Sequence, residues 1–115
     1  MEFTINGESY EIKFSYRVIN AVLRDLGLKS LDDFSKVGER FNIGNVHKYI
    51  HTALTASKAT RDNPKPSDIP SAKDIEWEMD DQPNLLADFL DGFNSGATLL
   101  MGGGKTVSKE LETGN

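Results

Sequence analysis

The amino-acid sequence predicts an α+β fold in which an N-terminal β-hairpin packs on a small bundle of three to four helices. Apolar and polar residues alternate near the N-terminus around an Asn-Gly pair, and apolar residues recur at helical spacing in later segments. The last residues are rich in glycine and polar side chains. A chain of 115 residues is long enough for one core. We therefore expect a single domain over residues 1–101 and a disordered tail over residues 102–115.

The hairpin is predicted by two short alternating segments, residues 2–5 and 9–14. Between them, Asn6-Gly7 is the pair that best accepts the positive φ angles of a type I′ turn. This turn fixes a register in which Phe3 lies opposite Tyr10. An aromatic cross-strand pair of this kind stabilises a two-stranded ribbon.

An amphipathic helix is expected directly after the hairpin. Ser15 is positioned to cap its start, and Gly27 to take the left-handed conformation that follows its end. The apolar residues between them recur at helical spacing, which predicts one buried face: Val18, Ile19, Val22, Leu23 and Leu26.

The middle of the chain is predicted to hold a short helix and then the central helix of the core. Ser30 and Asp33 form a capping-box pattern that opens a short helix ending near Gly38. Asn45 is expected to cap a helix over residues 45–59. The apolar stripe of this helix is the clearest in the chain and comprises Val46, Tyr49, Ile50, Ala53, Leu54 and Ser57.

Proline and capping residues divide the second half of the chain. Residues 60–71 contain three prolines and no periodic apolar pattern, which predicts a loop. Residues 74–80 alternate as a strand would, but the Ser71 cap favours a short helix, and we predict a helix there.

The last helix is expected to begin at Pro83 and to end at Gly96. Its apolar residues recur in two adjacent rows: Leu85, Leu86, Phe89, Leu90 and Phe93.

Charge and composition exclude several classes of partner and location. The net charge is −5: residues 1–60 hold eight basic and seven acidic residues, whereas residues 61–115 hold five basic and eleven acidic ones. Phosphate backbones bind clustered cations, which the sequence lacks, so we expect no nucleic-acid partner. The sequence has no run of about twenty apolar residues and no secretory signal at its Met-Glu-Phe-Thr start, and it has no cysteine. These features predict a cytoplasmic protein without a membrane partner.

Two histidines resemble part of a metal site. His47 and His51 share one face of the predicted central helix, as the ligands of His-x-x-x-His zinc sites do. However, Lys48 follows His47 where a zinc protease carries glutamate, and no third ligand can be named. We therefore expect no metal at this position.

Two further patterns also lack a required part. Counted from Asp74, Met79 and Leu85 stand where a calcium-binding EF-hand loop needs glycine and glutamate. Residues 102–106 read Gly-Gly-Gly-Lys-Thr, but Leu99 stands where a phosphate-binding loop needs its first glycine. The sequence also has no nucleophile-elbow pattern. We therefore expect no catalytic residues and no cofactor, and predict that the protein is not an enzyme.

A surplus of apolar residues near the C-terminus predicts a partner-binding surface. The two apolar rows of the last helix are wide, and Leu99-Leu100-Met101 continue them beside the predicted tail. The alternative is that the apolar residues of the helix itself pack in the core. The candidate contact residues are Leu86, Phe89, Leu90, Phe93, Leu99, Leu100 and Met101.

The first 27 residues carry a resemblance to a known family. They read Met-Glu-Phe-Thr-Ile-Asn-Gly-Glu-Ser-Tyr-Glu-Ile-Lys-Phe-Ser-Tyr-Arg-Val-Ile-Asn-Ala-Val-Leu-Arg-Asp-Leu-Gly. This segment resembles the start of the tail assembly chaperones of long-tailed, siphovirus-like phages and prophages of Gram-positive bacteria. Members typically begin with a strand, an Asn-Gly turn, a second strand ending in Lys-Phe, and a helix ending in glycine. The remainder is similar in plan, with a long middle helix followed by acidic helices.

The resemblance implies a function that involves no catalysis. Such chaperones bind the long helical tape-measure protein, keep it soluble, help to recruit tail-tube protein, and are absent from the mature virion. It therefore implies a protein of the host bacterial cytoplasm whose partners are the tape-measure and tail-tube proteins. Self-association is also plausible, because many copies would be needed to coat a very long client.

One further feature of the chaperone family and one alternative function stay open at this point. Many members of the family have a longer form made by a programmed frameshift, and Gly103-Gly104-Lys105 could be encoded by a slippery heptanucleotide. The protein could instead be a structural neck or tail-completion component of the virion, which would share the small α+β build.

Overall fold

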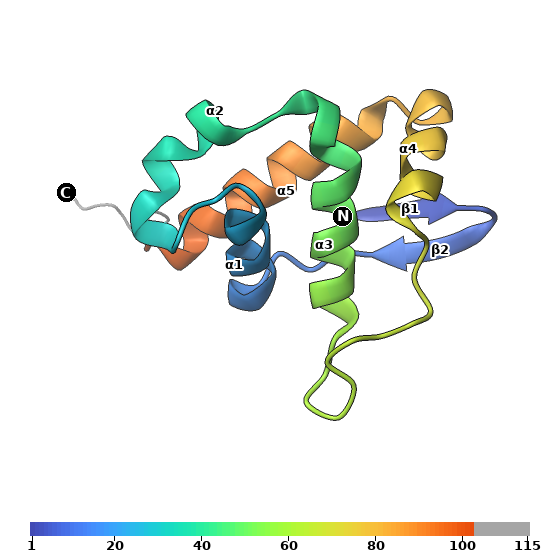
Figure 1. Ribbon diagram of the computed structural model, residues 1–115, viewed down its shortest axis with the longest axis horizontal. Helices are drawn as coiled ribbons and strands as arrows, with labels where there is room; N and C mark the ends of the chain where they lie inside the picture. The colour runs from blue at the N-terminus through green and yellow to red at the C-terminus, as the bar shows by residue number, and fades with distance from the viewer. Residues whose placement is uncertain (103–115) are drawn as a thin grey trace.

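The computed structural model describes residues 1–102 and has an α+β architecture in that range (Figure 1). A two-stranded antiparallel hairpin is followed by five α-helices, which confirms the predicted fold class. The predicted tail lies, from residue 103 on, outside the described residues. The elements are β1 (Glu2–Ile5), β2 (Glu8–Glu11), α1 (Tyr16–Asp25), α2 (Val37–Arg40), α3 (Val46–Lys58), α4 (Ala72–Asp81) and α5 (Asn84–Leu100), with 3₁₀ turns at Leu31–Lys36 and Ile43–Asn45.

The hairpin has the predicted turn and register. Asn6 and Gly7 have φ angles of 52° and 82°, as a type I′ turn requires. Phe3 pairs with Tyr10, and the centroids of their rings are 6.1 Å apart. Phe3 and Ile5 are buried, so β1 contributes one face to the core while its other face is exposed.

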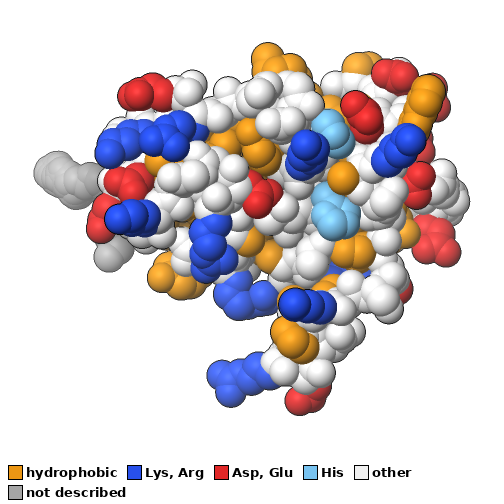
Figure 2. Space-filling model, in the orientation of Figure 1, with side chains coloured by type: hydrophobic (Ala, Val, Ile, Leu, Met, Phe, Trp, Pro, Cys, Tyr) orange, Lys and Arg blue, Asp and Glu red, His pale blue; other side chains and the backbone are white. Residues whose placement is uncertain are grey.

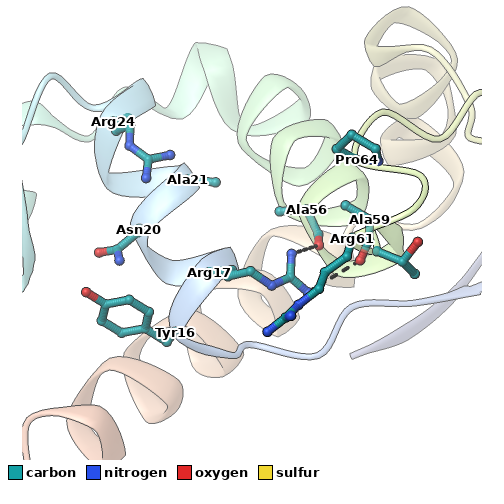
Figure 3. Close-up of a pocket in the computed structure, with 10 residues that line it drawn as sticks. Tyr16, Arg17, Asn20, Ala21, Arg24, Ala56, Ala59, Arg61 and Pro64 are labelled. Atoms are coloured by element: carbon teal, nitrogen blue, oxygen red, sulfur yellow. Dashed lines mark hydrogen bonds between the residues drawn. The ribbon is translucent and has the colours of Figure 1, made fainter.

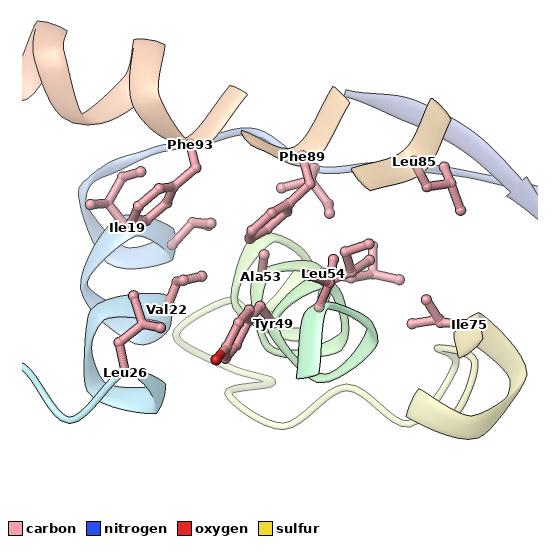
Figure 4. Packing of buried hydrophobic residues seen from close by; sticks show 14 of the residues in the cluster. Ile19, Val22, Leu26, Tyr49, Ala53, Leu54, Ile75, Leu85, Phe89 and Phe93 are labelled. Carbon is pink, nitrogen blue, oxygen red and sulfur yellow. The ribbon is translucent and has the colours of Figure 1, made fainter. Parts of the chain in front are cut away.

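The core lies between four helices and the hairpin. Figure 4 shows α3 in the middle, with side chains of α1, α4 and α5 converging on it. Every residue of the predicted α3 stripe from Val46 to Leu54 is buried, and Ser57 is half-buried. The buried face of α1 is also the predicted one. Gly27, with a φ of 77°, follows the end of α1, as expected.

Capping is partly as predicted. Ser71 Oγ accepts a hydrogen bond from the backbone N–H of Asp74 at 3.1 Å, which confirms the cap of α4 and decides residues 74–80 in favour of helix. Ser15 and Asn45 stand at the N-cap positions of α1 and α3, but their side chains make no capping hydrogen bond there. Instead, the Asn42 side chain accepts from Gly44 N at 2.8 Å, in the 3₁₀ turn that leads into α3.

The short helix differs from its prediction. Residues 31–36 form a 3₁₀ turn, and α2 then continues through Gly38 to Arg40, so the predicted end near Gly38 is wrong. Ser30 caps this segment, with its side chain accepting from Asp32 N at 3.2 Å. Gly38 does not have a positive φ, and the chain turns extended only at Phe41. As predicted, residues 60–71 form no helix or strand.

Gly96 does not end the last helix, and this prediction is wrong. α5 continues to Leu100. Glycine is needed at Gly92 and Gly96 because Phe14 packs directly against α5 at these positions. A Cβ atom at Gly96 would lie 2.8 Å from both the Cβ and the backbone oxygen of Phe14, and one at Gly92 only 2.3 Å from the Phe14 ring. The two glycines therefore make a notch that seats Phe14, whose ring centroid is 5.7 Å from that of Phe89.

Candidate partner-binding surfaces

The seven candidate contact residues divide into three groups according to their burial. Phe89 and Phe93 are core residues, with side chains 0% and 2% exposed, and no partner can reach them in this conformation. These two residues therefore pack in the core, which was the alternative to partner binding. Leu86 and Leu90 are half-buried, whereas Leu99, Leu100 and Met101 are 71%, 40% and 47% exposed.

The exposed residues form the end of α5, which we call the α5 tip (Leu99, Leu100 and Met101). Gly96 and Ala97 are the last buried residues of the helix, so the tip extends beyond the core. In Figure 1 this end of α5 lies at the opposite end of the molecule from the hairpin. Exposed adjacent apolar side chains of this kind are typical of contact surfaces. The tip is thus the part of the predicted surface that a partner can contact.

A second surface is a groove between α1 and the end of α3 (Figure 3). We call it the α1–α3 groove. It encloses about 660 Å³. Three of its ten lining residues are arginines, and none of the ten is acidic. The lining residues are Tyr16, Arg17, Asn20, Ala21, Arg24, Ala56, Ala59, Thr60, Arg61 and Pro64.

Arg17 holds the two walls of the groove together. Its guanidinium donates hydrogen bonds to the carbonyl oxygens of Ala56, at 2.8 Å, and Ala59, at 3.5 Å. The last carbonyls of a helix have no partner within the helix and carry its negative dipole end. Arg17 therefore satisfies the end of α3 while it anchors α1 beside it, as the dashed lines in Figure 3 show.

Arg61 is held at the groove by a tight turn. Thr60 N donates to Asn63 O at 3.0 Å, and Asn63 N donates to Thr60 O at 3.2 Å and to the Thr60 hydroxyl at 2.9 Å. These bonds close the chain around Arg61 and Asp62. The start of the proline-rich loop is thus an ordered part of the groove wall.

The arginines of the groove are not among the residues predicted from the sequence. Arg17 and Arg24 are seven residues apart, which places them on one face of a helix, and this signal was present in the sequence. Arg61 follows α3 in a loop, and its position relative to α1 depends on the packing of the two helices. A count of charges along the chain cannot show this juxtaposition.

The two histidines lie where the sequence placed them. His47 and His51 are on one face of α3, both half-buried, and Figure 2 shows the histidine side chains one above the other on the front of the molecule. Within residues 1–102, no three side chains of His, Cys, Asp or Glu are grouped so that they could hold a metal ion. The acidic residues from Asp74 to Asp81 belong to helix α4, not to a calcium loop. The Gly-Gly-Gly-Lys-Thr pattern lies outside the described residues from Gly103 on.

Comparison with protein-family models, with curated proteins and with solved structures finds no match to this chain. Of the helices in residues 1–102, none has both the length and the apolar character needed to cross a membrane.

Proposed function

We propose that the protein is a non-enzymatic phage tail assembly chaperone that binds the tape-measure protein, keeps it soluble, and helps to recruit tail-tube protein around it. The observation that carries the proposal is the α5 tip, where Leu99 and Met101 are 71% and 47% exposed. A protein that keeps an aggregation-prone helical client in solution needs apolar contact area that is free before the client binds. The resemblance of residues 1–27 to such chaperones names the client.

The charge of the chain supports the same proposal. Its net charge of −5 is concentrated in residues 61–115, the half that includes α4 and α5. A net charge far from zero favours solubility and opposes non-specific association. The α5 tip is therefore an apolar contact surface on an acidic domain, which suits a protein that must bind its client without precipitating with it.

Co-expression with the tape-measure protein of the phage or prophage that encodes this chain tests the proposal. The measurement is the fraction of tape-measure protein that stays soluble. We expect the wild-type chain to raise this fraction and the Leu99→Asp/Met101→Asp variant to fail, because charges at the tip oppose apolar contact. The matched control is Ala87→Asp/Asn94→Asp, which adds the same charge at exposed positions of the same helix away from the tip. A soluble fraction that the wild-type chain does not change, or that both variants support equally, would contradict the proposal.

Analysis of purified virions separates this function from that of a neck or tail-completion protein. A chaperone acts during assembly in the host bacterial cytoplasm, so we expect mass spectrometry of purified particles to lack its peptides. Peptides at the level of known virion components would favour the structural role.

A further inference from the structure

The α1–α3 groove is a basic surface on an acidic protein. The chain has a net charge of −5, yet the groove contains Arg17, Arg24 and Arg61, and none of its lining residues within 1–102 is acidic. The arginines come from two segments that only the packing of α1 against α3 brings together. Figure 3 shows Arg24 on α1 and Arg61 on the loop after α3, with Arg17 between the two walls.

Within the described residues, two of these arginines are in no ion pair. Arg17 is engaged with the carbonyls at the end of α3. The ion pairs formed within residues 1–102 join Lys36 to Asp33 and Lys58 to Asp68. Neither Arg24 nor Arg61 therefore has a carboxylate partner in the part of the chain that the structure describes.

Small apolar side chains form the floor of the groove. Ala21 on α1 faces Ala56 and Ala59 at the end of α3, and Pro64 lies beside them (Figure 3). Small side chains let another backbone approach closely, and they offer contact to methyl groups but no hydrogen bonds. Tyr16, which is 61% exposed, adds an aromatic ring to the lining.

We propose that the α1–α3 groove binds an acidic peptide segment of a partner protein. Carboxylates of the segment pair with Arg24 and Arg61, whose planar guanidinium groups match a carboxylate with two parallel hydrogen bonds. Small apolar side chains between these carboxylates lie on Ala21, Ala56 and Ala59. This site is distinct from the α5 tip, and the inference does not depend on the proposed chaperone function.

Charge and composition favour this occupant over three others. A nucleic acid needs a longer track of cations, and the acidic remainder of the domain repels a polyphosphate. Residues 103–115 of this chain contain two lysines and two glutamates, so they carry no net charge to complement the groove. The acidic helix α4, which a second copy could present, also carries Lys73 in its first turn.

Fluorescence anisotropy with a labelled peptide of three Glu-Ala-Ala-Glu repeats tests the site. We expect the full chain to bind this peptide and to bind its Gln-for-Glu counterpart at least about tenfold more weakly, with an affinity that falls as salt rises. Arg24→Glu and Arg61→Glu are each expected to weaken binding by about tenfold or more, because each places a negative charge where a carboxylate binds. The matched control is Lys48→Glu, which makes the same charge change at an exposed position of α3 outside the groove.

The remaining outcomes overturn the proposal. If the wild-type chain does not bind the acidic peptide, the groove is not its site. If Lys48→Glu weakens peptide binding as much as Arg24→Glu does, the binding is a non-specific charge effect. Tighter binding of a single-stranded oligothymidine that Arg24→Glu abolishes would assign the groove to nucleic acid. Wild-type oligomers in sedimentation that Arg24→Glu dissociates would assign it to a second copy. Circular dichroism of each variant verifies that it is folded.

Discussion

The two halves of α5 use the same kinds of apolar side chain for different purposes. In the first half Leu85, Phe89 and Phe93 are buried in the core, and the rings of Phe89 and Phe93 stack with centroids 6.0 Å apart. From Leu99 on, its apolar residues are exposed. The first half stabilises the domain, whereas the second leaves apolar area open. Hydrophobicity alone therefore does not show which residues of this helix are exposed; their position relative to the core does.

The largest expected effect is the loss of a core ring. Phe89→Ala removes a fully buried side chain that packs between Phe14 and Phe93, and we expect a loss of about 3–5 kcal/mol in the free energy of unfolding. Urea unfolding followed by circular dichroism measures it. A loss below about 1 kcal/mol would mean that the first half of α5 is not the core element described above.

Gly96→Ala has a smaller effect and tests the seat of Phe14. Alanine favours a helix by about 1 kcal/mol over glycine. Here its Cβ would meet the Phe14 backbone oxygen at 2.8 Å, which cannot rotate away, and overpacking of this kind costs about 1–3 kcal/mol or more. We therefore expect a net loss of stability in urea unfolding.

Gly38→Ala is the matched control for that substitution. Gly38 also lies in a helix, but beyond its chain neighbours and its own helix backbone no atom of residues 1–102 comes within 4 Å of an added Cβ, so stability should stay the same or rise slightly. If both variants were stabilised, the notch at Gly92 and Gly96 would have no role in packing Phe14.

Leu99→Ala is expected to have the smallest effect. Its side chain is 71% exposed, and substitutions at such surface positions usually change stability by no more than about 0.5 kcal/mol. Compared with Phe89→Ala in the same urea series, this variant separates the stabilising half of α5 from the exposed half. A loss comparable to that of Phe89→Ala would show that the tip is part of the core.

The hairpin and α1 could be predicted because their determinants are local. Asn6 and Gly7 set the turn, the turn sets the pairing of Phe3 with Tyr10, and Gly27 follows the end of α1. The prediction that α5 ends at Gly96 was wrong because the determinant there is a long-range contact. A glycine near the end of an apolar pattern usually marks a C-terminus, but this one exists to accommodate Phe14, which is distant in sequence and close only in the fold.

The candidate surfaces were predictable to different degrees for the same reason. The tip was predicted because Leu99-Leu100-Met101 are contiguous and continue the apolar rows beside the predicted tail. Phe89 and Phe93, for which core packing was the stated alternative, are buried. The α1–α3 groove was not found. It is assembled from α1 and from the segment after α3, and no local pattern joins them.

Amide hydrogen exchange of the free and the client-bound protein tests most directly the claim that the α5 tip is the contact surface for a helical client. We predict that binding of the tape-measure protein slows exchange at residues 98–101, while the amides of residues 85–93, already in the core, change little. Unchanged exchange at residues 98–101 in a complex that demonstrably forms, with slowing elsewhere, would contradict the claim.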